Sequence, residues 1–160
     1  MSSDNIFIRE MIGGDRDAVV DFFANMGEES TAMFNSSGGN TRKALSYVDG
    51  NREGRKYWIA EDKDAPGKMA GYTFIWDTDK SVVWFGIAVA DEWHGKGVGT
   101  KLIRFVIDYC KENGYHGILL STLYENKSAQ RLYEKNGFEK IGKHRDGEKE
   151  YLYILRFTHN

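Results

Sequence analysis

The 160-residue sequence predicts one α/β domain, residues 1–160, with a mixed, mostly antiparallel sheet of six to seven strands and helices on both faces. Two observations predict this class. Apolar patterns follow one another as strand, helical segment, three strands, helix, strand, helix and two strands. The stretch from Ser81 to Val89 is apolar on both faces, which is typical of a central strand covered by helices. This order differs from that of a doubly wound nucleotide-binding sheet.

The amino-terminal third combines one strand with a helical region. Asn5 to Glu10 alternates apolar and polar residues, which predicts the first strand. Asp15 to Met26 places apolar residues at helical spacing. Two shorter helices are predicted from Gly27 to Phe34 and from Thr41 to Val48, separated by a polar, glycine-containing loop from Asn35 to Asn40.

Three antiparallel strands follow in the middle of the chain. They are predicted from Lys56 to Asp62, from Lys68 to Trp76 and from Ser81 to Val89. Asp64-Ala65-Pro66-Gly67 forms the first turn between them, and Asp77-Thr78-Asp79-Lys80 forms the second.

The next part of the chain alternates helix and strand. Gly97 to Asn113 carries a continuous apolar stripe opposite a charged face, which predicts an amphipathic helix. Tyr115 to Leu123 predicts a strand. Asn126 is placed to cap the following helix, and Gly137 is placed to end it.

The carboxyl-terminal residues predict a hairpin. Its strands run from Phe138 to Lys143 and from Glu150 to Phe157, on either side of an Asp146-Gly147 turn.

Composition excludes several classes of protein. The formal net charge is −2, so we expect no general affinity for nucleic acid or for acidic membranes. The start of the chain has no pattern of a signal peptide and no apolar run has transmembrane length. With a single cysteine, these features predict a cytoplasmic protein. No metal is expected, because the candidate ligands lack ligand spacing: His94, His116, His144, His159 and Cys110.

A glycine-rich loop stands between an apolar strand and the amphipathic helix. It reads His94-Gly95-Lys96-Gly97-Val98-Gly99. A helix start offers unpaired amides and partial positive charge, and glycines let the backbone approach phosphate oxygens. The spacing matches neither a P-loop nor the dinucleotide fingerprint. Taken alone, the loop is equally compatible with a phosphate site and with a flexible turn.

A second pattern runs from Asn126 to Phe138. Asn126 and Tyr133 are seven residues apart, so they share one helix face about 10 Å apart along the axis. Taken alone, Asn126 is explained by helix capping, and Tyr133 by core packing against Ala129 and Leu132.

Together the two patterns resemble the GNAT superfamily of N-acetyltransferases. The run from Val89 to Gly99 looks like its pyrophosphate loop, Gln/Arg-x-x-Gly-x-Gly/Ala, with His94 where Gln or Arg is usual. The run Asn-x-x-Ala-x-x-Leu-Tyr-x-x-x-Gly-Phe, from Asn126 to Phe138, resembles its second motif. The resemblance covers Val82 to Phe138 most strongly; the stretch from Asp17 to Ser30 is faintly similar to protein-lysine acetyltransferase domains. It implies the GNAT fold and acetyl-coenzyme A as the acetyl donor.

The resemblance also implies roles for individual residues. Tyr133 would lie near the coenzyme A sulfur and act as a general acid, or as a hydrogen-bond donor to the developing thiolate. The backbone before the loop would pair with the pantetheine arm, and the loop would hold the pyrophosphate. The expected cofactor-binding residues are Ile87, Ala88, Val89, His94, Gly95, Lys96, Gly97, Val98, Gly99, Thr100 and Asn126.

The general base of the family has no match at its usual place. Many members carry a glutamate on the central strand, where this chain has Trp84. Neutralising a lysine-type amine at pH 7.5 costs about 4 kcal/mol, whereas an α-amine costs well under 1 kcal/mol. Three readings stay open: a carboxylate from elsewhere, such as Glu28 or Glu29; a water chain to bulk solvent; or an acceptor that is already partly neutral.

The sequence therefore predicts an enzyme, an N-acetyltransferase that moves an acetyl group from acetyl-coenzyme A to a primary amine by direct attack on the thioester. The acceptor is a small molecule or a protein. Two alternatives are a coenzyme A-binding regulatory module without transfer activity and an acyltransferase that uses a different acyl-coenzyme A. Pairing through the last strands, as in other family members, would give a homodimer.

Overall fold

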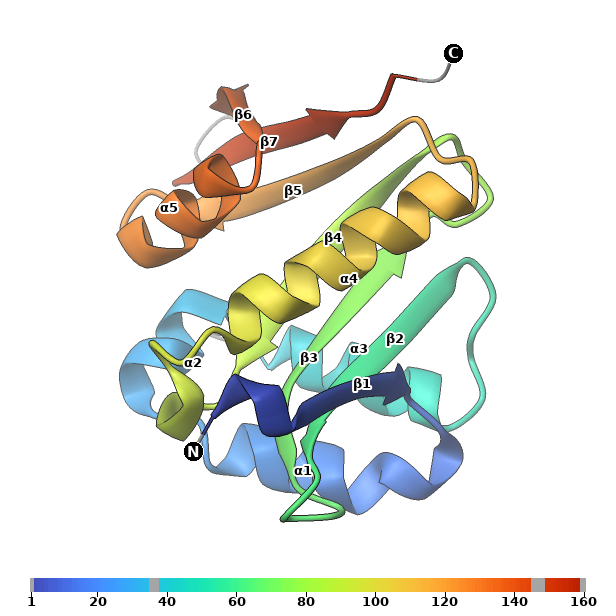
Figure 1. The fold of residues 1–160 in the computed structure, drawn as a ribbon, viewed down its shortest axis with the longest axis vertical. Helices are drawn as coiled ribbons and strands as arrows, with labels where there is room; N and C mark the ends of the chain where they lie inside the picture. The colour runs from blue at the N-terminus through green and yellow to red at the C-terminus, as the bar shows by residue number, and fades with distance from the viewer. Residues whose placement is uncertain (1, 35–37, 145–148, 159–160) are drawn as a thin grey trace.

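Seven strands form one twisted sheet in the part of the chain that the computed structural model describes, residues 2–34, 38–144 and 149–158 (Figure 1). Their order across the sheet is β1-β2-β3-β4-β5-β7-β6. All neighbours are antiparallel except β4 and β5, which are parallel. The strands are β1 (Ile6–Glu10), β2 (Arg55–Asp62), β3 (Met69–Trp76), β4 (Val82–Val89), β5 (Gly117–Leu123), β6 (Glu139–Lys143) and β7 (Glu150–Arg156).

Five α-helices accompany the sheet in the described residues, and the predicted order of elements is confirmed. The third helix begins inside the predicted 35–40 loop, because Gly38 takes a left-handed φ of 72° and lets the helix start at Gly39. The Asp146-Gly147 turn lies outside the described residues, but the antiparallel pairing of β6 with β7 confirms a hairpin. The helices are α1 (Arg16–Ala24), α2 (Glu28–Phe34), α3 (Gly39–Val48), α4 (Val98–Glu112) and α5 (Lys127–Lys135).

The two faces of the sheet carry separate apolar cores. Val19 of α1 and Ala44 of α3 pack on one face, against aromatic side chains of β2 and β3. The long helix α4 crosses the other face, where α5 also lies (Figure 1). The predicted mixed α/β class, with helices on both faces of the sheet, is therefore confirmed.

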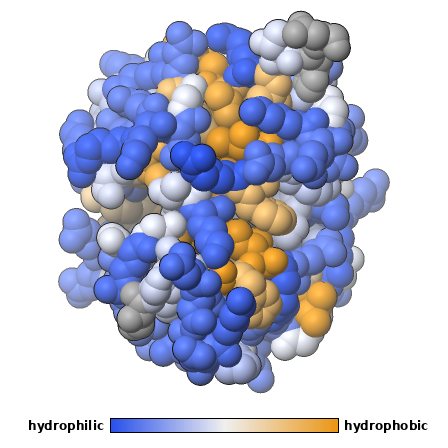
Figure 2. All heavy atoms as spheres, viewed as in Figure 1, coloured by the Kyte–Doolittle hydropathy of each residue, from blue (hydrophilic) through white to orange (hydrophobic). Residues whose placement is uncertain are grey.

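The amphipathic pattern of α4 explains its position. Leu102, Ile103, Val106 and Cys110 are fully buried, whereas Arg104 on the opposite face is exposed. Cys110 is a core residue on the apolar stripe of α4, and burial raises the pKa of its thiol to about 12. Charged and polar residues cover most of the face seen in Figure 2, with apolar residues gathered near its centre. No helix within the described ranges has both the length and the apolar character needed to cross a membrane.

The parallel pair at the centre of the sheet positions the site. β4 and β5 pair only over three positions, from Val82 with Gly117 to Trp84 with Leu119. Beyond Trp84 the two strands separate, and the rest of β4 has a strand neighbour only in β3. β4 is apolar on both faces because both faces are covered. Val83 and Phe85 pack under α4, and Ala88 packs in the core on the opposite face.

Candidate active site

A cavity of about 1250 Å³ opens where β4 and β5 separate. Its wall includes the glycine loop, residues of α2 and α3, and residues of the β6–β7 hairpin. Of the residues predicted to bind cofactor or act in catalysis, eleven line it, and Lys96 does not. The eleven are Ile87, Ala88, Val89, His94, Gly95, Gly97, Val98, Gly99, Thr100, Asn126 and Tyr133.

Three glycines determine the shape of the glycine loop. Gly95 and Gly97 take left-handed φ values of 74° and 87°, which side chains disfavour. Gly97 is the last residue before α4, so the unpaired amides of the first helical turn begin directly after it. Gly99 serves close packing instead: a Cβ there would lie 3.3 Å from Leu132 Cδ2 on α5. The loop thus combines an open helix start with a tight junction between α4 and α5.

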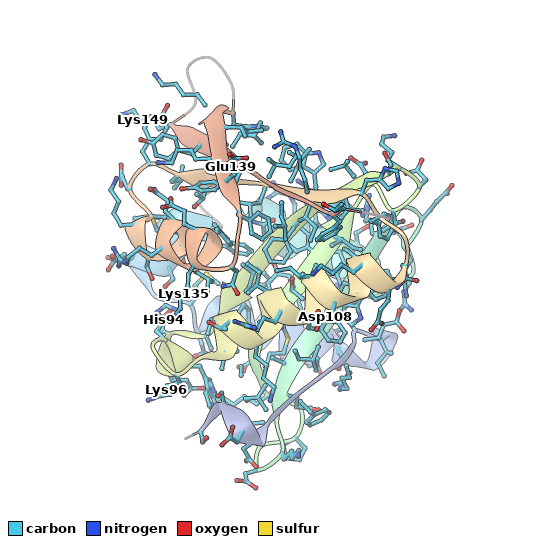
Figure 3. All side chains as sticks on the ribbon, turned by 45° about the horizontal axis from the view of Figure 1, so that its top comes forward. His94, Lys96, Asp108, Lys135, Glu139 and Lys149 are labelled. Carbon is cyan, nitrogen blue, oxygen red and sulfur yellow. The ribbon has the colours of Figure 1, made fainter. Side chains whose placement is uncertain are left out.

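His94 turns back onto the preceding strand. Its Nε2 lies 2.9 Å from the carbonyl oxygen of Val89, and it donates that hydrogen bond because a carbonyl only accepts. The same nitrogen is 3.9 Å from a carboxylate oxygen of Asp91. His94 and Lys96 both lie on the loop that leads into α4 (Figure 3). Lys96 is exposed and outside the cavity wall.

The free edge of β4 presents alternate residues to the cavity. Ala90 donates its amide to Ala70 of β3 at 2.8 Å, and Thr73 of β3 donates its hydroxyl to the carbonyl of Gly86 at 2.8 Å. Even-numbered residues of β4 therefore direct their backbone groups toward β3, and odd-numbered residues direct theirs toward the gap left by β5. The sequence predicted both Ile87 and Ala88 to bind the cofactor. The backbone groups of Ile87 face this gap, whereas those of Ala88 face β3.

Tyr133 lies on α5 in the wall of the cavity. Its side chain is 6% exposed and packs among Phe85, Phe138 and Tyr153, with ring centroids 5.9 to 6.4 Å apart in this cluster. Burial raises the pKa of its phenol well above the ordinary value. The raised pKa keeps Tyr133 a neutral hydroxyl donor at neutral pH.

The start of α5 is held by two polar side chains. Asn126 accepts a hydrogen bond of 3.2 Å from the amide of Ala129 and therefore caps α5. It also lines the cavity. Gln130 is buried and donates from Nε2 to the carbonyls of Leu123 and Tyr124, both at 3.0 Å. Sequence reasoning missed Gln130; a polar residue on the apolar face of the helix was the available signal.

Part of the cavity wall is aromatic and acidic. Glu29 lines the cavity and Glu28 does not. Trp84 faces it from β4, and the imidazole of His144 meets the Trp84 ring edge-on with centroids 5.3 Å apart. Asp77, predicted as a turn residue, has a left-handed φ of 61° and also lines the cavity. Sequence reasoning did not bring these side chains together, because they come from four separate elements.

The chain is similar in sequence and fold to known acetyltransferases. A model of the acetyltransferase (GNAT) family matches residues 23–138. The chain is 43% identical over 58 residues to the uncharacterized N-acetyltransferase YobR of Bacillus subtilis, covering 36% of this chain and 24% of that protein. It is 31% identical over 86 residues to a putative [ribosomal protein bS18]-alanine N-acetyltransferase of the same species, covering 54% of this chain and 56% of that protein. The matches thus span about a quarter to about a half of these curated relatives.

Solved structures share the fold over nearly the whole chain. The ribosomal-protein-S5-alanine acetyltransferase of Vibrio fischeri superposes with a TM-score of 0.79 at 17% identity, covering 95% of this chain and 93% of that one. The GNAT domain of S. lividans PAT superposes with a TM-score of 0.78 at 13% identity, covering 94% and 89%. At such identities these structures show the fold. Because the family model spans well over half of the chain, the protein belongs to the GNAT family of acetyltransferases.

Proposed function

We propose that the protein is an N-acetyltransferase that passes an acetyl group from acetyl-coenzyme A to a primary amine. The observation that carries the proposal is one continuous cavity lined by a helix start for phosphate, a free strand edge and a buried phenol. A coenzyme A molecule needs the first two, and thiolate departure benefits from the third. The glycine loop, Ile87 and Tyr133 supply them in that order.

In this proposal the donor lies along the gap between β4 and β5. Its pyrophosphate accepts hydrogen bonds from amides between Gly95 and Thr100. Its pantetheine arm pairs with the outward backbone groups of Ile87, since the carbonyl of Val89 is already occupied by His94. An amide on this edge also polarises the acetyl carbonyl.

The reaction is a direct attack. The neutral amine adds to the acetyl carbonyl carbon, the bond from that carbon to sulfur breaks, and sulfur leaves as a thiolate. A free phenol has a higher pKa than a free thiol, so transferring its proton outright costs about 2 kcal/mol. Burial raises the pKa of Tyr133 further. Tyr133 therefore acts by hydrogen-bonding the developing thiolate.

The proton of the incoming amine needs a route that β4 does not offer, since no residue of β4 from Val82 to Val89 is acidic. Glu29 is the better placed of the two carboxylates predicted from sequence, because it lines the cavity and Glu28 does not. We assign Glu29 as the group that receives the proton, directly or through water.

The alternative function is a coenzyme A-binding module without transfer, which the tryptophan on β4 favours. Incubation with acetyl-coenzyme A and a panel of amines separates the two: an alanine-ended peptide, a lysine peptide and simple alkylamines. Free thiol released only when an amine is present supports transfer. Tight coenzyme A binding without such release supports the module. Repeating the assay with longer acyl donors tests the second alternative, a different acyl-coenzyme A.

Two further properties belong to the proposal. The protein acts in the cytoplasm, in keeping with its single, buried and unpaired Cys110, and has no nucleic acid or membrane partner. It pairs as a homodimer through the last strands, since β6 is an edge strand whose five residues are all exposed. Light scattering at several protein concentrations measures the oligomeric state directly.

A further inference from the structure

The cavity has an aromatic floor. Phe74 covers the place of a missing side chain on β4, since a Cβ on Gly86 would lie 2.1 Å from its ring. Phe74 stacks on Trp76 with centroids 4.6 Å apart and planes tilted by 23°. Trp76 is the direct cross-strand partner of Trp84. The three rings therefore lie side by side on one face of β3 and β4, and all three line the cavity.

The charged residues of the cavity wall are mainly acidic. Glu29, Asp77 and Glu150 line the same cavity from α2, the β3–β4 turn and β7. Lys43 of α3 is the only lysine or arginine among the described lining residues. Three carboxylates in the same cavity wall as the aromatic rings make a cavity that attracts a cation and would repel an anionic acceptor.

A lysine of the chain already occupies the aromatic floor. The ammonium of Lys43 lies over the Trp76 ring, 4.4 Å from its centroid. Lys43 as a whole is exposed, so its ammonium leaves water only in part to reach this ring. A primary alkylammonium is therefore a group that this surface holds by cation–π attraction.

We propose that the acceptor is a linear alkylamine with a second ammonium group, such as a diamine or polyamine, and that this ammonium displaces Lys43 from the aromatic floor. The proposal rests on the acetyltransferase function proposed above and names its acceptor class. One nitrogen of the acceptor attacks the thioester while the other stays charged over Trp76 and Trp84. The second charge thus selects the substrate and orients the chain of methylenes along β4.

The test compares linear diamines of several lengths, each with the monoamine in which a methyl group replaces the second amino group. We expect the best diamine to exceed its monoamine in kcat/KM by about tenfold, in line with a partly desolvated cation–π contact. Equal kcat/KM values for the two series would overturn the inference while leaving acetyl transfer intact. Absence of any amine-dependent thiol release would instead overturn the proposed function.

Variants connect the selectivity to these residues. Trp76→Leu should reduce the diamine-to-monoamine ratio to near one. Tyr151→Leu is the matched control, because Tyr151 also lies under a lysine, Lys140 at 3.8 Å, but outside the cavity. Lys43→Ala should lower the KM for the diamine, whereas Lys43→Arg should keep it. A ratio that is the same in wild type and Trp76→Leu, with both proteins folded by circular dichroism, would contradict the assignment.

Discussion

The carboxylate of Asp91 accepts a hydrogen bond of 2.7 Å from the hydroxyl of Ser30. It also accepts one of 2.9 Å from the amide of Gly27, so both bonds satisfy groups around the start of α2. A Cβ on Gly27 would lie 2.5 Å from this carboxylate, which explains a glycine at that position. Since Asp91 stands three residues before His94, it joins the glycine loop to the helix that carries Glu29.

Replacing Asp91 by Ala should therefore affect the acceptor more than the donor. Loss of the two bonds should destabilise the fold by about 1 kcal/mol, as for other helix caps. Because α2 is then held less firmly, the KM for the amine should rise while the Kd for coenzyme A changes little. Ser30→Ala removes one bond and should show a smaller effect in the same direction. Equal changes in both constants would argue against this link.

Gly97 offers a direct test of the phosphate assignment. Gly97→Glu should greatly weaken coenzyme A binding in a titration, because the side chain brings strain and negative charge to the loop. Gly97→Ala should cost about 1–2 kcal/mol of stability through its left-handed backbone. Gly114→Ala is the matched control, since Gly114 ends α4 with a φ of 78° far from the loop. Unchanged affinity in Gly97→Glu would refute the loop assignment.

Tyr133→Phe should lower kcat by about a hundredfold with little change in the Kd for coenzyme A, as for loss of one donor to a developing anion. Because burial raises the pKa of Tyr133, the phenol stays neutral and the loss should be the same across the neutral pH range. Tyr153→Phe is the control in the same ring cluster; its hydroxyl bonds Glu134 and it does not line the cavity. Wild-type turnover in Tyr133→Phe would remove its proposed role.

Stability in acid should depend on Asp15. Burial alone would raise the pKa of this carboxyl, but hydrogen bonds from Arg9 and from the amide of Ile12 outweigh it and hold the pKa below its usual value. A lowered folded-state pKa stabilises the protein above the unfolded pKa, near 4, and this contribution is lost as the pH falls through the folded value. Asp15→Asn should lower the free energy of unfolding by about 1–3 kcal/mol at pH 7. Measured by urea unfolding, the loss of stability between neutral and acid pH should be smaller in the variant than in the wild type. An equal loss of stability in the two proteins would contradict this account.

The donor side of the site could be predicted because its signals are local. The glycine loop and the Asn126–Tyr133 helix are continuous segments whose spacing determines which groups share a face. The acceptor side could not, because Trp76 meets Trp84 only through the register of β3 with β4. His144 reaches the Trp84 ring only through the hairpin of β6 and β7. The spacing of residues along the chain does not predict contacts that depend on how the strands pair.

Two glycines show the same limit within the fold. Gly86 leaves a gap on β4 that the ring of Phe74 fills from the neighbouring strand, so the residue that decides its role is twelve positions away. Gly38 belongs to a stretch predicted as loop, yet its left-handed backbone begins α3. The sequence placed Gly86 inside a predicted strand and Gly38 inside a predicted loop, and only the packing around each glycine shows its role.

The central claim is direct acetyl transfer from acetyl-coenzyme A to an amine, and a single-turnover experiment tests it. The protein is mixed with donor carrying an isotopic label in the acetyl group, and the amine, the protein and coenzyme A are followed by mass spectrometry. The account predicts that label appears in the amide product at the rate at which free coenzyme A appears, and never on a side chain of the protein. Label that stays in the thioester, or that accumulates on the protein before the amine, would contradict it.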